Sequence, residues 1–283
     1  MIRFAKDADL AGLKALWQEA FGDPPQVVDH YFAHRHQNEH MLVDETGGVI
    51  GGMMALLPVT LQTPGESFKG QYIYAVATRI DFRGQGISTR LLEYAHTFMR
   101  EQGESAAVLL PASPGLYNFY GKRGYENIFY MDSATLLANE ILTCPQDAAW
   151  ADCDAADFER LRRLGFSKSS LFVDWDQKAL SYVISSLQNA GGVTRLVLGS
   201  AEACAVWERD GRHVMVKELA LNQMDAREAL SILHSYLQAD AYQLRLPAGS
   251  FRGAITQPFG MIRWLRDIPP LSGEPPYLSL ALD

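Results

Sequence analysis

The chain has little cysteine, no long apolar run and no excess of basic residues. Its three cysteines (Cys144, Cys153 and Cys204) are odd in number and lack metal-ligand spacing, which favours reduced thiols. No segment approaches the roughly 18 apolar residues that span a bilayer. The opening residues are interrupted by acidic side chains, unlike a secretory signal peptide. With a net charge of −8, nucleic acid and anionic membranes are disfavoured as partners. We therefore expect a cytoplasmic protein.

A group of histidines near the N-terminus raises the question of a metal site. They lie in a polar stretch without a nearby cysteine or carboxylate cluster of ligand spacing, so we interpret them as solvated side chains and expect no metal: His30, His34, His36 and His40. The length of 283 residues is comfortable for two domains of about 140 residues each.

What the sequence does contain is a glycine-rich turn between a strand and a helix. The run Tyr72–Ala77 is rich in aromatic and β-branched residues and predicts a strand. The turn Arg83–Ser88 follows, and after it apolar residues recur at helical spacing up to Gly103. A helix that begins at a glycine turn presents backbone N–H groups and the positive end of its dipole, which together favour an anion. A phosphate-bearing ligand is the first hypothesis.

Three kinds of glycine loop bind phosphate in this setting. A P-loop requires Lys-Ser or Lys-Thr after the last glycine, and neither follows Gly86. A dinucleotide fingerprint requires a third glycine where Thr89 stands. The segment Arg83-Gly84-Gln85-Gly86-Ile87-Ser88 instead resembles the pyrophosphate loop of the Gcn5-related N-acetyltransferases (GNAT), in which Gln/Arg-x-x-Gly-x-Gly/Ala recurs. Ser88 departs from that pattern at its last small position.

A second segment strengthens the resemblance. Tyr117–Tyr125 is similar to the family segment in which an aromatic-Tyr pair ends a short helix and Gly-Phe or Gly-Tyr opens a strand. The resemblance implies a catalytic α/β domain of the GNAT fold over residues 1–138, a mixed sheet flanked by helices, with acetyl-CoA as co-substrate. It implies that Tyr120 donates a proton to the leaving thiolate, and Tyr117, one helical turn earlier, is the rival donor. It assigns cofactor binding to Val76, Ala77, Thr78, Arg83, Gly84, Gln85, Gly86, Ile87, Ser88 and, in place of a family Asn, Ser113.

The second half repeats the order helix, hairpin, helix and strand. A helix is expected over 176–190, a hairpin around Asp210-Gly211, and a helix after Asp225 with Glu228 as its capping-box partner. Strands are expected over 242–246 and 277–282. No glycine loop precedes Asp225, so residues 139–283 are interpreted as a degenerate GNAT-like domain without a cofactor loop, with another α/β domain as the alternative. Such a tandem resembles the Eis-type family, without its sterol-carrier-like third domain.

The general base has no obvious candidate side chain. Gly70 stands near the position where family members carry a Glu, and Tyr72 and Tyr74 are poor bases. A relayed water or the C-terminal carboxylate of Asp283 are the two substitutes. The resulting prediction is an acetyl-CoA-dependent N-acetyltransferase acting on a primary amine of a small molecule or peptide. A non-catalytic acyl-CoA-binding or regulatory protein is the alternative, and self-association is left open. A transferase of longer acyl or aminoacyl groups is less favoured, since an aminoacyl-tRNA donor requires a basic protein surface.

Overall fold

The chain forms two compact units. The computed structural model describes residues 1–283 except 189, 269, 279, 281 and 283. The N-terminal unit comprises Met1–Thr60, Phe68–Glu126 and Met261–Pro269, and the C-terminal unit comprises Leu61–Ser67, Asn127–Gly260 and Pro270–Asp283. The domain boundary expected between residues 138 and 139 stays a prediction.

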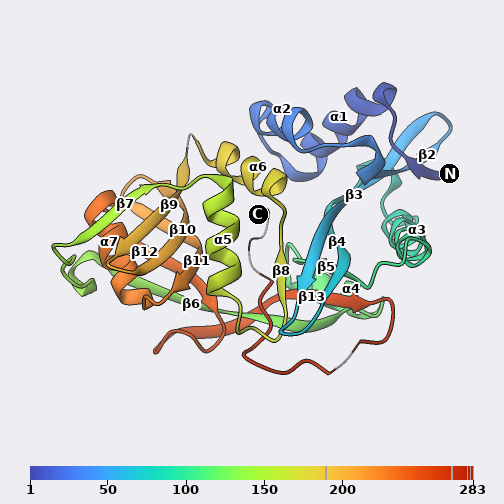
Figure 1. Cartoon of the computed structure of the whole chain (residues 1–283). Coiled ribbons are helices and arrows are strands. Elements are labelled where there is room, and N and C mark those ends of the chain that lie inside the picture. Colours follow the sequence, from blue (N-terminus) through green and yellow to red (C-terminus); the bar gives the residue numbers. More distant parts are fainter. Residues whose placement is uncertain (189, 269, 279, 281, 283) are drawn as a thin grey trace. The chain divides into compact units, whose positions relative to one another are not determined.

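The N-terminal unit is a mixed sheet flanked by helices. Its strands follow the order β1-β2-β3-β4-β5-β13, in which β4 and β5 are parallel while β5 and β13 are antiparallel. The elements are β1 (Ile2–Phe4), α1 (Leu10–Phe21), α2 (Pro25–His34), β2 (Met41–Thr46), β3 (Val49–Gln62), β4 (Ser67–Thr78), α3 (Ile87–Glu101), β5 (Ala106–Leu109), α4 (Pro114–Gly121) and the end of β13 (Ile255–Trp264) (Figure 1).

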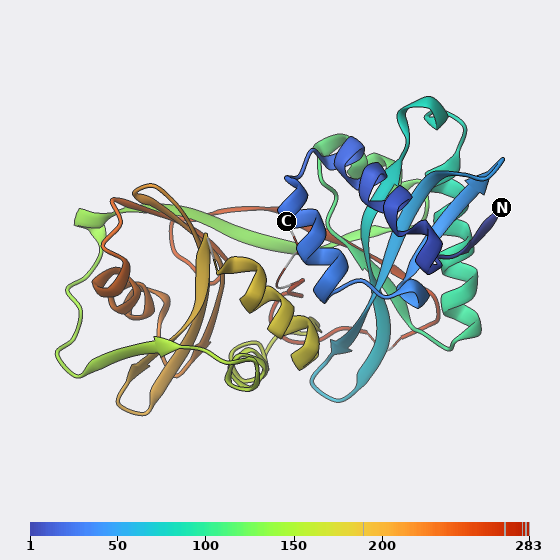
Figure 2. The same cartoon turned by 90° about the horizontal axis from the view of Figure 1, so that it is seen from above.

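The two faces of this sheet carry different cores. Because side chains alternate along a strand, Ile73 of β4 faces α3 while Tyr74 faces the other way. Ile73 belongs to a buried cluster with Leu91 and Leu92 of α3. Tyr74 instead lies against Trp17 of α1, with ring centroids 5.7 Å apart. The helices α1 and α2 (blue) therefore cover one face and α3 (teal) the other, as Figure 2 shows.

The strands of the C-terminal unit follow the order β6-β12-β11-β10-β9-β7. The pairs β7–β9, β9–β10, β10–β11 and β12–β6 are antiparallel, whereas β11 and β12 are parallel. The elements are β6 (Glu126–Leu137), β7 (Ala148–Asp152), α5 (Ala155–Gly165), β8 (Phe172–Asp174), α6 (Gln177–Leu187), β9 (Gly191–Leu198), β10 (Ala201–Asp210), β11 (His213–Asn222), α7 (Ala226–Leu237) and β12 (Ala241–Pro247).

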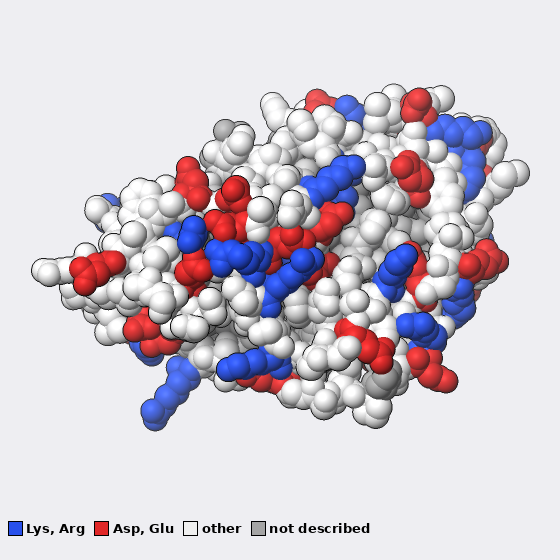
Figure 3. Space-filling view, in the orientation of Figure 1, with Lys and Arg blue, Asp and Glu red and all other residues white. Residues whose placement is uncertain are grey.

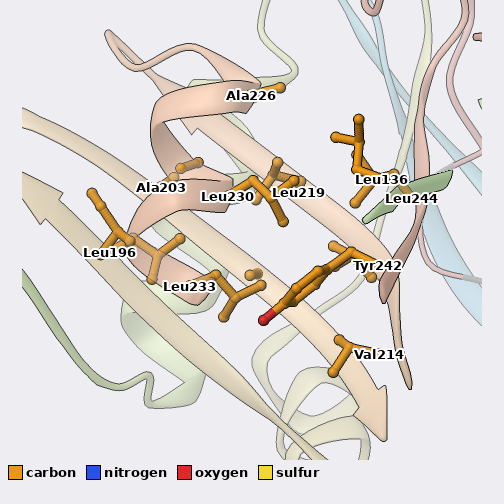
Figure 4. Close-up of a cluster of buried hydrophobic side chains, with 14 of the residues drawn as sticks. Leu136, Leu196, Ala203, Val214, Leu219, Ala226, Leu230, Leu233, Tyr242 and Leu244 are labelled. Atoms are coloured by element: carbon orange, nitrogen blue, oxygen red, sulfur yellow. The ribbon is translucent and has the colours of Figure 1, made fainter. Parts of the chain in front are cut away.

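Helix α7 supplies much of the core of this unit. Leu230 and Leu233 point from α7 toward the strands, where Tyr242 and Leu196 meet them (Figure 4). A buried ionic group fixes α5 to β11: Arg162 donates to the Glu218 carboxylate at 2.8 Å and to that of Asp174 at 3.2 Å. All three side chains are buried, which is tolerable because each charge has a partner.

The expected elements of the second half can be compared with the structure. The helix after Asp225 is confirmed with its capping box, because Asp225 accepts from the Glu228 N–H and Glu228 accepts from the Asp225 N–H. The hairpin around Asp210-Gly211 is confirmed as β10–β11. The strand expected over 277–282 is not formed by its described residues: Tyr277 makes an isolated bridge with Phe172. Residues 279 and 281 lie outside the described residues.

Within the described part of the chain, the helices are too short or too polar to cross a membrane. Cys153 and Cys204 are free thiols whose sulfur atoms lie 3.8 Å apart.

Candidate active site

The glycine turn forms an uncapped helix N-terminus. After β4 a short 3-10 turn (Ile80–Phe82) leads to Gly84 and Gly86, which have φ of 76° and 74°. This left-handed backbone favours glycine. Gly86 is the N-cap of α3 and supplies no side-chain cap, and no acidic residue lies in the first turn. Among the hydrogen bonds of the described residues, none takes its donor from the N–H groups of 84–88. The dipole and these N–H groups form a ready anion site.

One detail of the turn differs from the sequence expectation. The N–H of Arg83 donates to the carbonyl of Ile80 at 3.2 Å, so this donor is already used. The Arg83 guanidinium donates to the Thr78 carbonyl at 3.3 Å and its side chain remains exposed to solvent. The Thr78 and Ser88 hydroxyls share a hydrogen bond of 2.9 Å, which joins the end of β4 to the first turn of α3.

Two glycines of β3, which sequence reasoning missed, hold the turn against the sheet. A Cβ on Gly52 would lie closer than 3.0 Å to Ile87 Cγ2 and 3.1 Å from the Ala77 carbonyl oxygen. A Cβ on Gly51 would lie 3.1 Å from Ile87 Cδ1. The first residue of α3 therefore packs directly on the backbone of β3. A Gly-Gly pair within an apolar strand is the signal that indicates such a close approach.

The strands β4 and β5 separate beside this turn. Their parallel pairing covers Gly70–Tyr72 with Ala106–Val108. In the described register no pair joins β5 to the stretch of β4 from Ile73 to Thr78. Ala75 has a φ of 49°, rare for a residue with a side chain, and marks an irregularity within β4. Backbone groups of Val76, Ala77 and Thr78, three of the predicted cofactor residues, lie in this separated stretch.

Tyr120 ends α4 within the core that also contains α3. It belongs to the same buried cluster as Ile87, the residue that opens α3. Burial raises the pKa of Tyr120 to about 12, and the nearby Arg123 guanidinium opposes this rise. The Tyr117 hydroxyl is less buried, and burial raises its pKa as well. Ser113 precedes α4 as its N-cap, and no hydrogen bond among the described residues joins its side chain to the glycine turn.

Arg123 links the segment that carries Tyr120 to the glycine turn. Its Nη2 donates to Thr89 Oγ1 in the first turn of α3 at 2.5 Å. Its Nη1 donates to the Phe119 carbonyl at 2.6 Å, and its guanidinium carbon lies 3.5 Å from the centroid of the Phe119 ring. Sequence reasoning did not single out Arg123. Arg123 brings a positive charge close to both Tyr120 and the open end of α3.

The C-terminal unit contains a matched crossover with a closed helix end. Strands β11 and β12 are parallel and pair only from His213–Val216 with Ala241–Leu244, as β4 and β5 pair over a short stretch. The helix between them, α7, begins at Asp225, whose carboxylate accepts from the N–H groups of Arg227 and Glu228. Two acidic side chains therefore occupy the helix end that α3 leaves open.

The separated stretch of β4, from Ile73 to Thr78, contains no carboxylate side chain that could act as the general base. Gly70 pairs with Ala106 in the sheet. Tyr72 is buried, and its ring centroid lies 6.3 Å from that of Tyr74. Asp283 lies outside the described residues. Among the residues that the structure describes, no three His, Cys, Asp or Glu side chains are grouped to hold a metal ion. Acidic and basic side chains are interspersed on the face seen in Figure 3.

Comparison with known proteins gives a consistent result. Residues 1–128 match the family model described as acetyltransferase (GNAT) domain. No curated protein sequence matches the chain. Among solved structures, a GCN5-related N-acetyltransferase from Anabaena variabilis is similar, with a TM-score of 0.77 at 15% identity, covering 94% of this chain and 73% of that one.

Two further solved structures share the fold. A probable N-acyltransferase from Enterococcus faecalis has a TM-score of 0.73 at 14% identity, covering 94% of this chain and 72% of that one. Eis1 from Mycobacterium abscessus has a TM-score of 0.68 at 13% identity, covering 94% of this chain and 74% of that one. The predicted resemblance to the GNAT superfamily and the predicted fold are thereby confirmed.

Proposed function

Because residues 1–128 match the model of the GNAT acetyltransferase domain, we propose that the protein is an N-acetyltransferase using acetyl-CoA as acetyl donor. The acceptor is a primary amine on a small molecule or a peptide. The observation that carries the proposal is the open N-terminus of α3 beside the stretch of β4 that does not pair with β5. The contrast with α7 supports it, because the same crossover there is closed by Asp225 and Glu228.

The donor would bind along the separated stretch of β4. Its pyrophosphate would accept hydrogen bonds from the N–H groups of Gly84, Gln85, Gly86, Ile87 and Ser88, with the Arg83 guanidinium adding charge. The amides of the pantetheine arm would pair with the backbone of Val76, Ala77 and Thr78, as an added strand would. Ser113, before α4, is proposed as a further contact.

The transfer itself needs few chemical groups from the protein. The amine nitrogen attacks the thioester carbonyl carbon, the C–S bond breaks, and the Tyr120 hydroxyl gives its proton to the leaving thiolate. Water then removes the extra proton from the new amide nitrogen, and a water proton restores the phenol. Burial makes Tyr120 a weaker acid than a free phenol, and the Arg123 guanidinium offsets part of this effect. Holding the two reactants together accounts for most of the rate, since effective molarities are worth about 7–11 kcal/mol.

A non-catalytic acyl-CoA-binding protein is the second candidate. It is favoured by Gly70, which offers no side chain as a base where family members carry a Glu. Tyr120, in the same buried cluster as the residue that opens α3, favours the enzyme instead.

The anion site can be tested by giving α3 the closed end of α7. Gly86→Asp places a carboxylate at the N-cap, whereas Gly86→Asn adds the same shape without charge, and both residue types tolerate left-handed backbone. We expect Gly86→Asp to bind acetyl-CoA at least about tenfold more weakly than Gly86→Asn in calorimetric titrations, because like charge would meet the pyrophosphate. Equal affinities would place the donor elsewhere.

The role of Tyr120 can be tested with matched tyrosines. Tyr120→Phe should lower kcat by about a hundredfold, within the usual contribution of a general acid, and leave acetyl-CoA affinity unchanged. Tyr117→Phe examines the rival donor, and Tyr94→Phe, at a residue 38% exposed on α3, is the control. Binding without turnover in the wild-type protein, across a panel of amines, would favour the non-catalytic candidate.

We propose residues 139–283 as the degenerate second GNAT-like domain, apart from Met261–Pro269, which belongs to the N-terminal unit. The crossover β11–α7–β12 and its short parallel pairing support this assignment. Glu218, beyond the last pair of β11 with β12, is bound by Arg162 of α5. The cytoplasmic location remains a proposal as well.

A further inference from the structure

A half-buried arginine late in the sequence, Arg263, contacts residues of the N-terminal unit. Arg263 belongs to β13, whose last residues pair with β5: Arg263 opposes Ala107 and Met261 opposes Leu109. Its guanidinium lies beside Gly124, where a Cβ would be in ordinary contact at 3.6 Å from Arg263 Nε, and the φ of 80° at Gly124 favours glycine in this turn. Arg263 lies far beyond the region that matches the acetyltransferase family model.

The Arg263 guanidinium determines the protonation state and tautomer of the buried His96 side chain. Arg263 Nη1 lies 3.0 Å from His96 Nδ1, and because a guanidinium can only donate, this imidazole nitrogen must accept. His96 is therefore neutral with its proton on Nε2, which donates to the Tyr125 hydroxyl at 2.8 Å. Burial and the nearby Arg263 and Arg100 charges lower the pKa of His96 to about 3, in agreement with this assignment.

The same guanidinium holds the turn that follows Tyr120. Arg263 Nη1 also donates to the Arg123 carbonyl at 2.6 Å. The Tyr120 carbonyl accepts from the N–H of Arg123 at 2.8 Å and from that of Tyr125 at 3.2 Å. The Tyr125 ring packs edge-on against the Tyr120 ring, with centroids 5.5 Å apart. Tyr120 is thus bounded on its backbone and on its ring by residues that Arg263 and His96 hold.

We propose that Arg263, acting through His96, Tyr125 and the Arg123 carbonyl, is the positioning residue for the Tyr120 phenol. This inference rests on the proposed role of Tyr120. It makes the end of β13 a part of the catalytic domain, although the chain reaches this segment only after residues Asn127–Gly260 of the C-terminal unit. The groups that lie around the Tyr120 side chain are Arg123 on the turn after α4 and Tyr125, the residue before β6, and Arg263 lies near Tyr125.

The first test measures the Tyr120 phenol itself and needs no acceptor. Phenolate absorbance is titrated in the wild type and in Tyr120→Phe, and the difference isolates Tyr120. The same pair is measured with Arg263→Met added. We expect the Tyr120 transition, at about 12 in the wild type, to move toward that of a free phenol, about 10. An unchanged transition would overturn the proposal, whatever the activity.

The second test separates positioning from binding. Arg263→Met and His96→Gln should lower kcat at least about tenfold while KM for acetyl-CoA stays within about twofold, since only the proton donor is displaced. Arg263→Lys should restore part of kcat, because an ammonium can donate to both His96 and the Arg123 carbonyl. Arg100→Gln is the control, because it also removes a positive charge near His96, while the hydrogen bond of Arg100 in the described part of the chain goes to the His96 carbonyl, at 3.5 Å, and not to the imidazole.

The outcomes can be told apart even if a variant folds poorly. Tyr125→Phe removes one hydroxyl from the network and keeps the ring, so it offers a milder variant with the same expected direction. A parallel loss of kcat in Arg100→Gln, or a rise in KM without a change in kcat, would overturn the proposal. No acetyl-CoA binding by the wild type would contradict the proposed function instead, and the phenol titration would still judge the role of Arg263.

Discussion

Substituting Gly52 of β3 by alanine should push on the glycine turn and the start of α3, because the new Cβ would point toward them. The new Cβ would meet Ile87 Cγ2 at less than 3.0 Å, the Ala77 carbonyl oxygen at 3.1 Å and Leu91 Cδ1 at 3.3 Å. The Ala77 carbonyl belongs to the backbone of a strand and cannot shift easily, so the N-terminus of α3 must move away. Overpacking of this kind costs about 1–3 kcal/mol of unfolding free energy.

The displacement should also weaken donor binding. Ile87 is the first residue of α3, so any shift moves the N–H groups proposed to hold the pyrophosphate. Losing one charge-assisted hydrogen bond costs about 1.5–3 kcal/mol, which is roughly tenfold or more in the dissociation constant of acetyl-CoA. Denaturant unfolding would measure the first effect and calorimetry the second.

A double-substitution cycle makes this reasoning refutable. Ile87→Ala alone creates a cavity, with a cost of about 2–5 kcal/mol. Combined with Gly52→Ala, the smaller side chain makes room for the new methyl group, so the double variant should be more stable than the sum predicts by at least about 1 kcal/mol. Gly65→Ala is the control, because its Cβ would meet nothing within 4 Å. Additive effects, or a Gly52→Ala protein with wild-type stability and affinity, would refute the packing argument.

Three further predictions follow from the structure. Burial raises the pKa of Glu104, whose contribution to stability is therefore present below its unfolded pKa and lost as pH rises through the folded value. Glu104→Gln should accordingly stabilise the protein at pH 7 by about 1 kcal/mol and have little effect near pH 4, because the new amide can also donate to the unpaired Gln71 Oε1. Thermal melts at both pH values would measure this difference, and an equal gain in stability at both pH values would contradict the prediction. A fragment ending at residue 138 should fail to fold cooperatively, since β5 loses Met261–Trp264 as its antiparallel partner; adding the missing strand as a peptide should raise its helical circular dichroism, and a stably folded fragment would disprove this dependence. A short C-terminal extension should sharply lower turnover if the Asp283 carboxylate is the base, whereas unchanged turnover would leave the water relay.

Local patterns in the sequence determined the elements that carry the proposed site. The strand before the glycine turn and the helix after it were predictable, because Gly84 and Gly86 mark positions of left-handed backbone and the apolar residues after them recur at helical spacing. The capping box at Asp225 was equally local, since one carboxylate three residues before another satisfies N–H groups of a single helix turn.

Other features depend on contacts between residues far apart in the chain, and only the tertiary structure decided them. No local pattern indicates that Arg263 meets His96, or that Arg123 reaches Thr89. The left-handed Ala75 and the early end of the β4–β5 pairing depend on how two strands diverge, which residue identity alone does not encode. Sequence motifs identify groups that one helix turn or one strand end brings together. The buried network behind Tyr120 needs three segments to pack first, so its physical cause is the fold itself.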